Sequence, residues 1–101
     1  MPVSAHPSND GSEVTIRVEG RFDFSDHRQF RQIQEDFVDE DKACIIDMSG
    51  AEYMDSSALG MLLVLRESAG GNASQVRITN CREELRSILE IANFHKLFAI
   101  E

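Results

Sequence analysis

The sequence predicts a small α/β protein in which helices pack against one face of a mixed β-sheet. Residues 13–20 alternate apolar and polar side chains, as in a strand with one buried face. Residues 26–38 instead repeat apolar side chains at the helical spacing. Strand-like and helix-like segments then alternate to the end of the chain, and right-handed crossovers between such strands give a mostly parallel or mixed sheet.

The chain is expected to open with two neighbouring strands. Residues 3–6 can form a short first strand, and the turn formers that follow include Asp10 and Gly11, a pair typical of tight turns. Residues 13–20 form the second strand. The side chains that this strand directs to its buried face are Val14, Ile16 and Val18.

Residues 26–38 are predicted to form the first helix. The Ser25 hydroxyl can cap free backbone N–H groups at its start, and Asp26 suits the positive end of the helix dipole. The apolar stripe of this helix consists of Phe30, Ile33, Phe37 and Val38. A compact apolar strand follows at 43–48, and a loop is expected at 49–55.

The second half of the chain repeats the alternation. A helix at 57–69 is expected to end in a left-handed cap at the two glycines 70 and 71. A strand follows at 74–81, and Asn80 with Glu83 resembles a capping box for a helix over about 82–92. Residues 96–101 close the chain as a short strand, so the predicted order is β-β-α-β-α-β-α-β.

Composition narrows the possible functions. The 101 residues are enough for one domain, residues 1–101, and the formal net charge of −8 opposes binding to nucleic acid or to anionic membranes. No apolar run reaches the length of about 18 residues that spans a bilayer, and residues 1–13 have neither the basic start nor the apolar stretch of a secretory signal. We therefore expect a cytoplasmic protein.

The cysteines and histidines predict no metal site and no cofactor. Cys44 and Cys81 stand alone, without nearby histidine pairs, and a disulfide is not expected in the cytoplasm. Both cysteines are interpreted as small buried hydrophobes. The histidines do not have ligand spacing; they are His6, His27 and His95.

The segment from Tyr53 to Leu65, YMDSSALGMLLVL, places two hydroxyls before an apolar helix. Ser56 is expected to be the N-cap of this helix. A phosphate on that hydroxyl would meet free N–H groups and the positive end of the dipole, so it could alter the surface without destroying the fold. The helix also carries more apolar residues than one buried stripe needs, which indicates either burial on both sides or a contact surface for a partner. Gly60 is expected to allow close packing against the sheet.

Catalysis by these serines is not supported by the pattern. A nucleophile elbow requires G-x-S-x-G, whereas the local sequence is D-S-S-A-L-G. A phosphate-binding GxxxxGK[ST] loop is also absent from the sequence. We therefore expect no enzyme activity and no catalytic residue.

Three segments together resemble the STAS domains of bacterial anti-sigma-factor antagonists. These segments are VEGRFDF, IIDMSGAEYMDSSALGMLL and LEIANFHKLFAI, and the resemblance covers essentially the whole chain in the family's order and spacing. The fold implied is a small β-sheet with helices packed on one side. The implied function is a protein–protein switch that works without a cofactor.

The resemblance also implies roles for particular residues. Ser56 matches the serine that a partner kinase phosphorylates, Ser57 is its usually unmodified neighbour, and Asp23 and Asp55 match acidic positions near it. The unmodified protein would bind an anti-sigma factor or a serine kinase, and a metal-dependent serine phosphatase would restore binding. The apolar candidates for the surface around the phosphorylation site are Met54, Leu59 and Met61.

Two departures from the family pattern matter. Ala58 stands where many members have glycine, and the common C-terminal helix is expected to be truncated or absent after the last strand. An alternative function stays open on the sequence: a STAS subunit of an ABC-type lipid-transport complex, in which the serine would only cap the helix.

Overall fold

A computed structural model describes residues 2–101 and contains the predicted elements in the predicted order. The strands are β1 (Val3–Pro7), β2 (Glu13–Phe22), β3 (Ala43–Met54), β4 (Val76–Thr79) and β5 (Ala99–Ile100). The α-helices are α1 (His27–Phe37), α2 (Ser56–Ser68) and α3 (Glu83–Ile91). Short 3₁₀ turns lie at Phe24–Asp26, Gly71–Ala73 and Phe94–Lys96.

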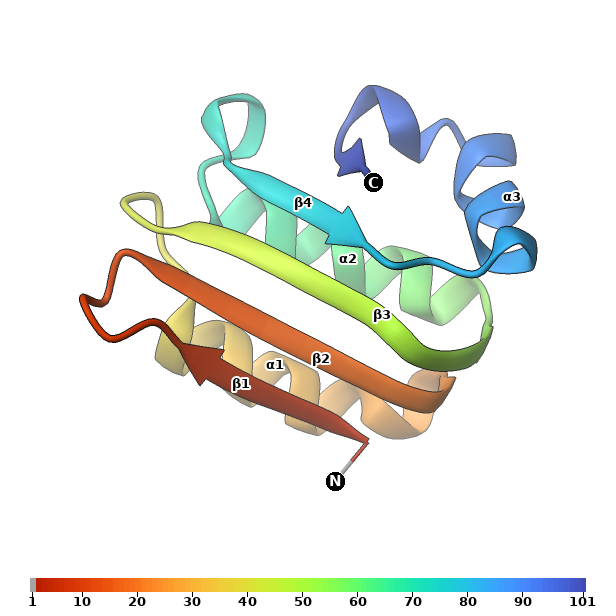
Figure 1. Cartoon of the computed structure of the whole chain (residues 1–101), viewed down its shortest axis with the longest axis horizontal. Helices are drawn as coiled ribbons and strands as arrows, with labels where there is room; N and C mark the ends of the chain where they lie inside the picture. The colour runs from red at the N-terminus through yellow and green to blue at the C-terminus, as the bar shows by residue number, and fades with distance from the viewer. Residues whose placement is uncertain (1) are drawn as a thin grey trace.

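The five strands form one mixed sheet in the order β1-β2-β3-β4-β5. β1 pairs antiparallel with β2, and every later pair is parallel. α1 and α2 lie side by side behind the sheet, and α3 lies beyond the end of β4 (Figure 1). The prediction of a mixed sheet with helices on one face is therefore confirmed, and β5 is the last element within residues 2–101.

The core lies between the sheet and the helices. The inward residues of β2 and β3 are almost fully inaccessible, and Leu62 and Leu65 of α2 pack against them from the helix side. The opposite face of the sheet is polar: Arg17 pairs with Asp47 at 3.5 Å, and Arg77 pairs with Glu101 at 3.6 Å. A sheet with one apolar and one polar face explains the period-two alternation of β2.

β3 is longer than the sequence predicts. It runs to Met54, so the expected loop at 49–55 is wrong for all but its last residue. The register with β2 shifts twice, after Arg17 and after Gly20, and each shift places one extra residue on β3. Each bulge interrupts the alternation of inward and outward side chains, so the sequence pattern of these residues does not indicate a strand.

Two predicted helix caps are wrong. Asp23, not Ser25, caps the turn before α1. Asn80 does not cap α3: its backbone is left-handed at φ 60°, and its side-chain amide donates to Asp47 at 3.2 Å. The predicted left-handed glycines after α2 are confirmed, with φ of 114° at Gly70 and 61° at Gly71.

The central strand provides a test of this core. Ile46 of β3 is completely buried, whereas Ile91 at the end of α3 is 84% exposed. We expect Ile46→Ala to lower the free energy of unfolding by about 2–5 kcal/mol, because it removes buried methylene groups and leaves a cavity. Ile91→Ala is the matched control and should change it by less than about 0.5 kcal/mol. Equal losses in urea denaturation of the two variants would contradict the assignment of the core.

Candidate functional site

The candidate site lies where β2 and β3 end side by side. Phe22 pairs with Met54 in the sheet, and the Asp55 N–H donates to the Phe22 carbonyl at 3.4 Å. Asp23 and Asp55 directly follow these paired residues. The two carboxylates therefore lie at one edge of the sheet, close enough that the Asp23 charge repels that of Asp55.

Asp55, not Ser56, is the N-cap of α2. Its backbone is extended, with φ −113° and ψ −176°, and its carboxylate accepts a hydrogen bond from the Ala58 N–H at 3.1 Å. The same oxygen accepts from the Ser57 hydroxyl at 2.6 Å. The expected N-cap role of Ser56 is therefore wrong, because the side chain of the aspartate before it already accepts from a free N–H of the first turn, that of Ala58.

The two serines consequently have different environments. Ser56 is the first residue of α2 and its side chain is exposed. Ser57 is half-buried, and its hydroxyl is held by Asp55. This hydrogen bond is the main reason that the pKa of Asp55 lies below its ordinary value. The aspartate is therefore ionised at neutral pH beside a freely accessible Ser56.

Asp23 fixes the other side of the site. Its carboxylate accepts from both the Ser25 hydroxyl and the Ser25 N–H, and these bonds hold the Asp23 pKa below its ordinary value. The Asp26 carboxylate accepts from the Asp23 N–H at 3.2 Å, which completes a reciprocal capping box. Asp26 is buried, and this burial raises its pKa.

The predicted apolar surface is largely incorrect. Met54 and Met61 are only 3% and 7% exposed and belong to the core, and Leu59 is half-buried against that core. Met54 is the last residue of β3 and faces inward, and Met61 lies on the buried side of α2. The apolar residues that do reach the surface near the two serines or along α2 are Phe24, Tyr53, Leu63 and Val64.

Sequence reasoning missed two of the exposed groups that accompany Ser56. Phe24 is 67% exposed and stacks on His27, with ring centroids 5.1 Å apart. The Arg21 guanidinium lies over the Tyr53 ring, 4.1 Å from its centroid, and 3.5 Å from the Asp23 carboxylate. Arg21 and Tyr53 are 32 residues apart, and the bulges that bring them into register leave no local sequence signal.

The described residues contain no cluster of three or more histidine, cysteine or acidic side chains arranged to hold a metal ion. Cys44 and Cys81 are both free thiols. Burial raises the pKa of Cys44 to about 12, and it also raises the pKa of the half-buried Cys81. None of the helices within residues 2–101 has the length and apolarity needed to cross a bilayer.

Comparison with known protein families gives a match over nearly the whole chain. A family model for the STAS domain matches residues 4–101. The chain belongs to the STAS domain family. This STAS domain is 48% identical over 100 residues to the STAS-domain containing protein PA14_20770 of Pseudomonas aeruginosa strain UCBPP-PA14, with 99% of each chain covered. The family is generally non-enzymatic.

Solved structures of anti-sigma factor antagonists share the fold. The antagonist from Mycobacterium paratuberculosis superposes with a TM-score of 0.81 at 19% identity, covering 97% of this chain and 82% of its own. The Bacillus protein SpoIIAA in its phosphorylated form superposes with a TM-score of 0.66 at 18% identity, covering 98% of this chain and 90% of its own. At these identities the likeness concerns the fold of the STAS domain.

The role of Asp55 as the N-cap can be separated from its charge. We expect Asp55→Ala to lower the melting temperature by several degrees, because the N–H groups of α2 lose their acceptor. Asp55→Asn keeps an acceptor oxygen and should recover most of this loss, as measured by thermal denaturation followed by circular dichroism.

The pH dependence of stability distinguishes the Asp55 carboxylate from the amide of the Asp55→Asn variant. The Asp55 pKa is lower in the folded protein than its ordinary value of 3.8, so the ionised form stabilises the fold above that pH. This stabilisation is lost as the pH falls through the lowered pKa. The stability difference between the native protein and Asp55→Asn should therefore shrink on acidification, and a difference that grows would contradict the assignment.

Proposed function

We propose that this STAS domain is an anti-sigma-factor antagonist whose partner binding is controlled by phosphorylation of Ser56. In the unmodified state it binds an anti-sigma factor or a partner-switching serine kinase, and the phosphate releases it. A metal-dependent serine phosphatase restores the binding state. The protein itself has no catalytic role in this cycle and needs no cofactor.

The observation that carries the proposal is the difference between the two adjacent hydroxyls. A kinase must reach the serine oxygen and place it in line with a nucleotide phosphate, and the exposed Ser56 allows this approach. The Ser57 hydroxyl already donates to the Asp55 carboxylate at 2.6 Å and is half-buried. Access therefore favours modification of Ser56.

The electrostatics of the site support an effect of phosphate on binding. The surroundings of Ser56 already include the ionised carboxylates of Asp23 and Asp55, with Arg21 as the cation nearest to Asp23. A phosphate adds about two negative charges at this point. A partner that covers a neutral hydroxyl can satisfy it with one hydrogen bond, whereas a buried phosphate without a matching cation costs several kcal/mol.

We expect the kinase of the native cell to modify Ser56 and to leave Ser57 unmodified. Peptide mapping by mass spectrometry of protein purified from that cell would locate the phosphate. Ser57→Ala is the matched variant and should still be phosphorylated, because the acceptor oxygen at position 56 is unchanged. Phosphate on Ser57, or none under any growth condition, would contradict the assignment.

Phosphorylation of Ser56 should weaken the partner complex roughly a hundredfold or more. The partner can be captured with Ser56→Ala as bait, using Ser56→Asp for comparison, and then titrated by calorimetry. Ser56→Ala should bind about as well as the native protein, and Ser56→Asp should fall between the unmodified and phosphorylated forms. Ser87→Asp adds the same charge on the exposed side of α3 and should leave the affinity unchanged.

Equal affinities of the phosphorylated and unmodified protein would reject the switch. That result would favour the constitutive subunit of a lipid-transport complex, in which the serine is not modified. Tighter binding of the phosphorylated form would preserve a switch of opposite sign and would indicate a cluster of arginines on the partner.

A further inference from the structure

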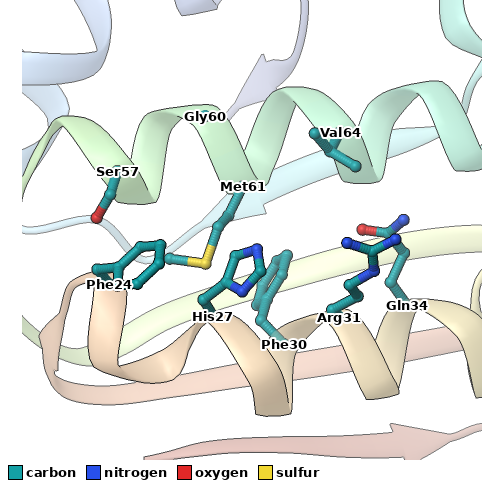
Figure 2. A pocket seen from close by; sticks show the side chains of 9 residues that line it. All are labelled: Phe24, His27, Phe30, Arg31, Gln34, Ser57, Gly60, Met61 and Val64. Atoms are coloured by element: carbon teal, nitrogen blue, oxygen red, sulfur yellow. The ribbon is translucent and has the colours of Figure 1, made fainter.

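A groove between α1 and α2 begins at Ser57, the residue after Ser56. Its volume is about 290 Å³. Figure 2 shows Ser57 and Phe24 at one end, Met61 and His27 in the middle, and Val64 facing Gln34 and Arg31 at the other end. The Gln34 side-chain amide donates to the Ser68 hydroxyl at 2.7 Å and joins the two helices beyond Val64.

The lining of the groove has helical periodicity on both sides. α1 contributes His27, Phe30, Arg31 and Gln34, and α2 contributes Ser57, Gly60, Met61 and Val64. Each set has the spacing i, i+3, i+4 and i+7, so the groove runs along about two helical turns, or about 10 Å. Its apolar rims are exposed to solvent, with Phe24 at 67% and Val64 at 57%. Exposed apolar rims along such a groove are typical of a surface that another helix covers.

No contact within the fold requires a glycine at position 60. A glycine inside a helix is less stable than an alanine by about 1 kcal/mol. The expected close packing of Gly60 against the sheet is wrong: the residue is exposed, and a Cβ atom at this position would have no neighbour within 4 Å. Because Gly60 has no side chain, the groove is open at this position on the α2 side. A glycine there is explained when another backbone approaches closely at this point.

Two arginines, Arg28 and Arg31, lie beside the groove in a protein whose net charge is −8. Arg28 and Arg31 line a second hollow along α1 together with His27, Gln32 and Glu35, and Arg31 also lines the groove. Arg28 lies in the first turn of α1, where the helix dipole disfavours a cation, and that turn contains no acidic residue. Arg31 pairs with Glu35 at 3.4 Å, whereas Arg28 takes part in no ion pair within residues 2–101. An acidic partner would satisfy this cation.

The geometry points to one occupant: a short amphipathic helix of the partner protein, with apolar side chains on one face and acidic residues beside them. Its apolar side chains would contact the exposed rims at Phe24 and Val64, its backbone would pass close to Gly60, and its acids would face Arg28 and Arg31. This inference rests on the proposed function, because the helix would belong to the partner that phosphorylation of Ser56 releases. A phosphate beside Ser57 would repel the same acidic helix.

A synthetic peptide tests the groove without knowledge of the natural partner. The probe is a fluorescein-labelled amphipathic helix of about 16 residues, long enough for partial helicity alone, with leucines on one face and glutamates beside them. A sister peptide carries lysines in place of the glutamates. By fluorescence anisotropy, we expect the acidic peptide to bind the native protein at least about tenfold more tightly than the basic one. No binding of the acidic peptide, or tighter binding of the basic one, would overturn the inference.

Variants of the groove give matched controls. Val64→Glu should weaken the acidic peptide about tenfold or more, whereas Leu63→Glu, one residue away and outside the lining, should change its affinity less than about twofold. Gly60→Leu should also weaken binding about tenfold without lowering the melting temperature, since glycine is the poorer helix former. Equal affinity of all three variants would place the peptide elsewhere and reject the groove.

Two further outcomes separate this inference from its alternatives. Size-exclusion chromatography with light scattering can detect a dimer of the native protein. A dimer that Gly60→Leu abolishes would show that a second copy occupies the groove, and it would overturn the inference of a partner helix.

Protein carrying phosphoserine at position 56 should bind the acidic peptide more weakly. If phosphorylation leaves binding of both the peptide and the captured partner unchanged, the switch fails while the groove stands.

Discussion

The parallel pairing of β2 with β3 is the interaction on which the rest of the structure depends. It holds Phe22 beside Met54 and so brings the residues that follow each strand to one edge of the sheet. Asp23 then caps the turn that leads into α1, and Asp55 caps α2. Two strand ends in register thus determine where two helices begin, and the candidate site lies between these beginnings.

The same pairing brings the proposed phosphorylation site, Ser56, close to the groove. Because α1 and α2 start from neighbouring strands and cover one face of the sheet, their first turns lie next to each other (Figure 1). Phe24 follows Asp23, and Ser57 follows Asp55 and Ser56, so Ser56 directly precedes a residue that lines the groove between the helices. In the proposed function, modification of this one hydroxyl would alter the adjacent surface while the core keeps its packing.

Much of the fold follows from local patterns in the sequence. The alternation of Val14, Ile16 and Val18 identifies β2, and the two glycines at 70 and 71 identify the end of α2, because each depends on nearby residues alone. The end of β3 could not be predicted in this way. Its two bulges are defined only by the pairing with β2, and they break the period of two on which recognition of a strand relies.

The candidate site was predictable in position but not in detail. The order Asp-Ser-Ser before an apolar helix locates a helix start, yet either Asp55 or Ser56 can be an N-cap, and only the backbone conformation distinguishes them. Met54 and Met61 have the chemistry of a contact surface, but their burial depends on the bulged end of β3 and on the face of α2 turned to the sheet. The exposure of Val64 and the empty space beside Gly60 require the packing of two helices that are distant in sequence.

The central claim is that the start of α2 accepts a phosphate on Ser56 while the fold stays intact, so that the modification acts on the surface alone. Attraction to the helix dipole and repulsion from the nearby carboxylates are opposing effects, each on the order of 1 kcal/mol. The most direct test is the thermal unfolding of protein with phosphoserine at position 56 beside the unmodified protein. A cooperative transition within about 5 °C of the unmodified one agrees with the claim. Loss of cooperative melting would show that the phosphate acts by unfolding the domain.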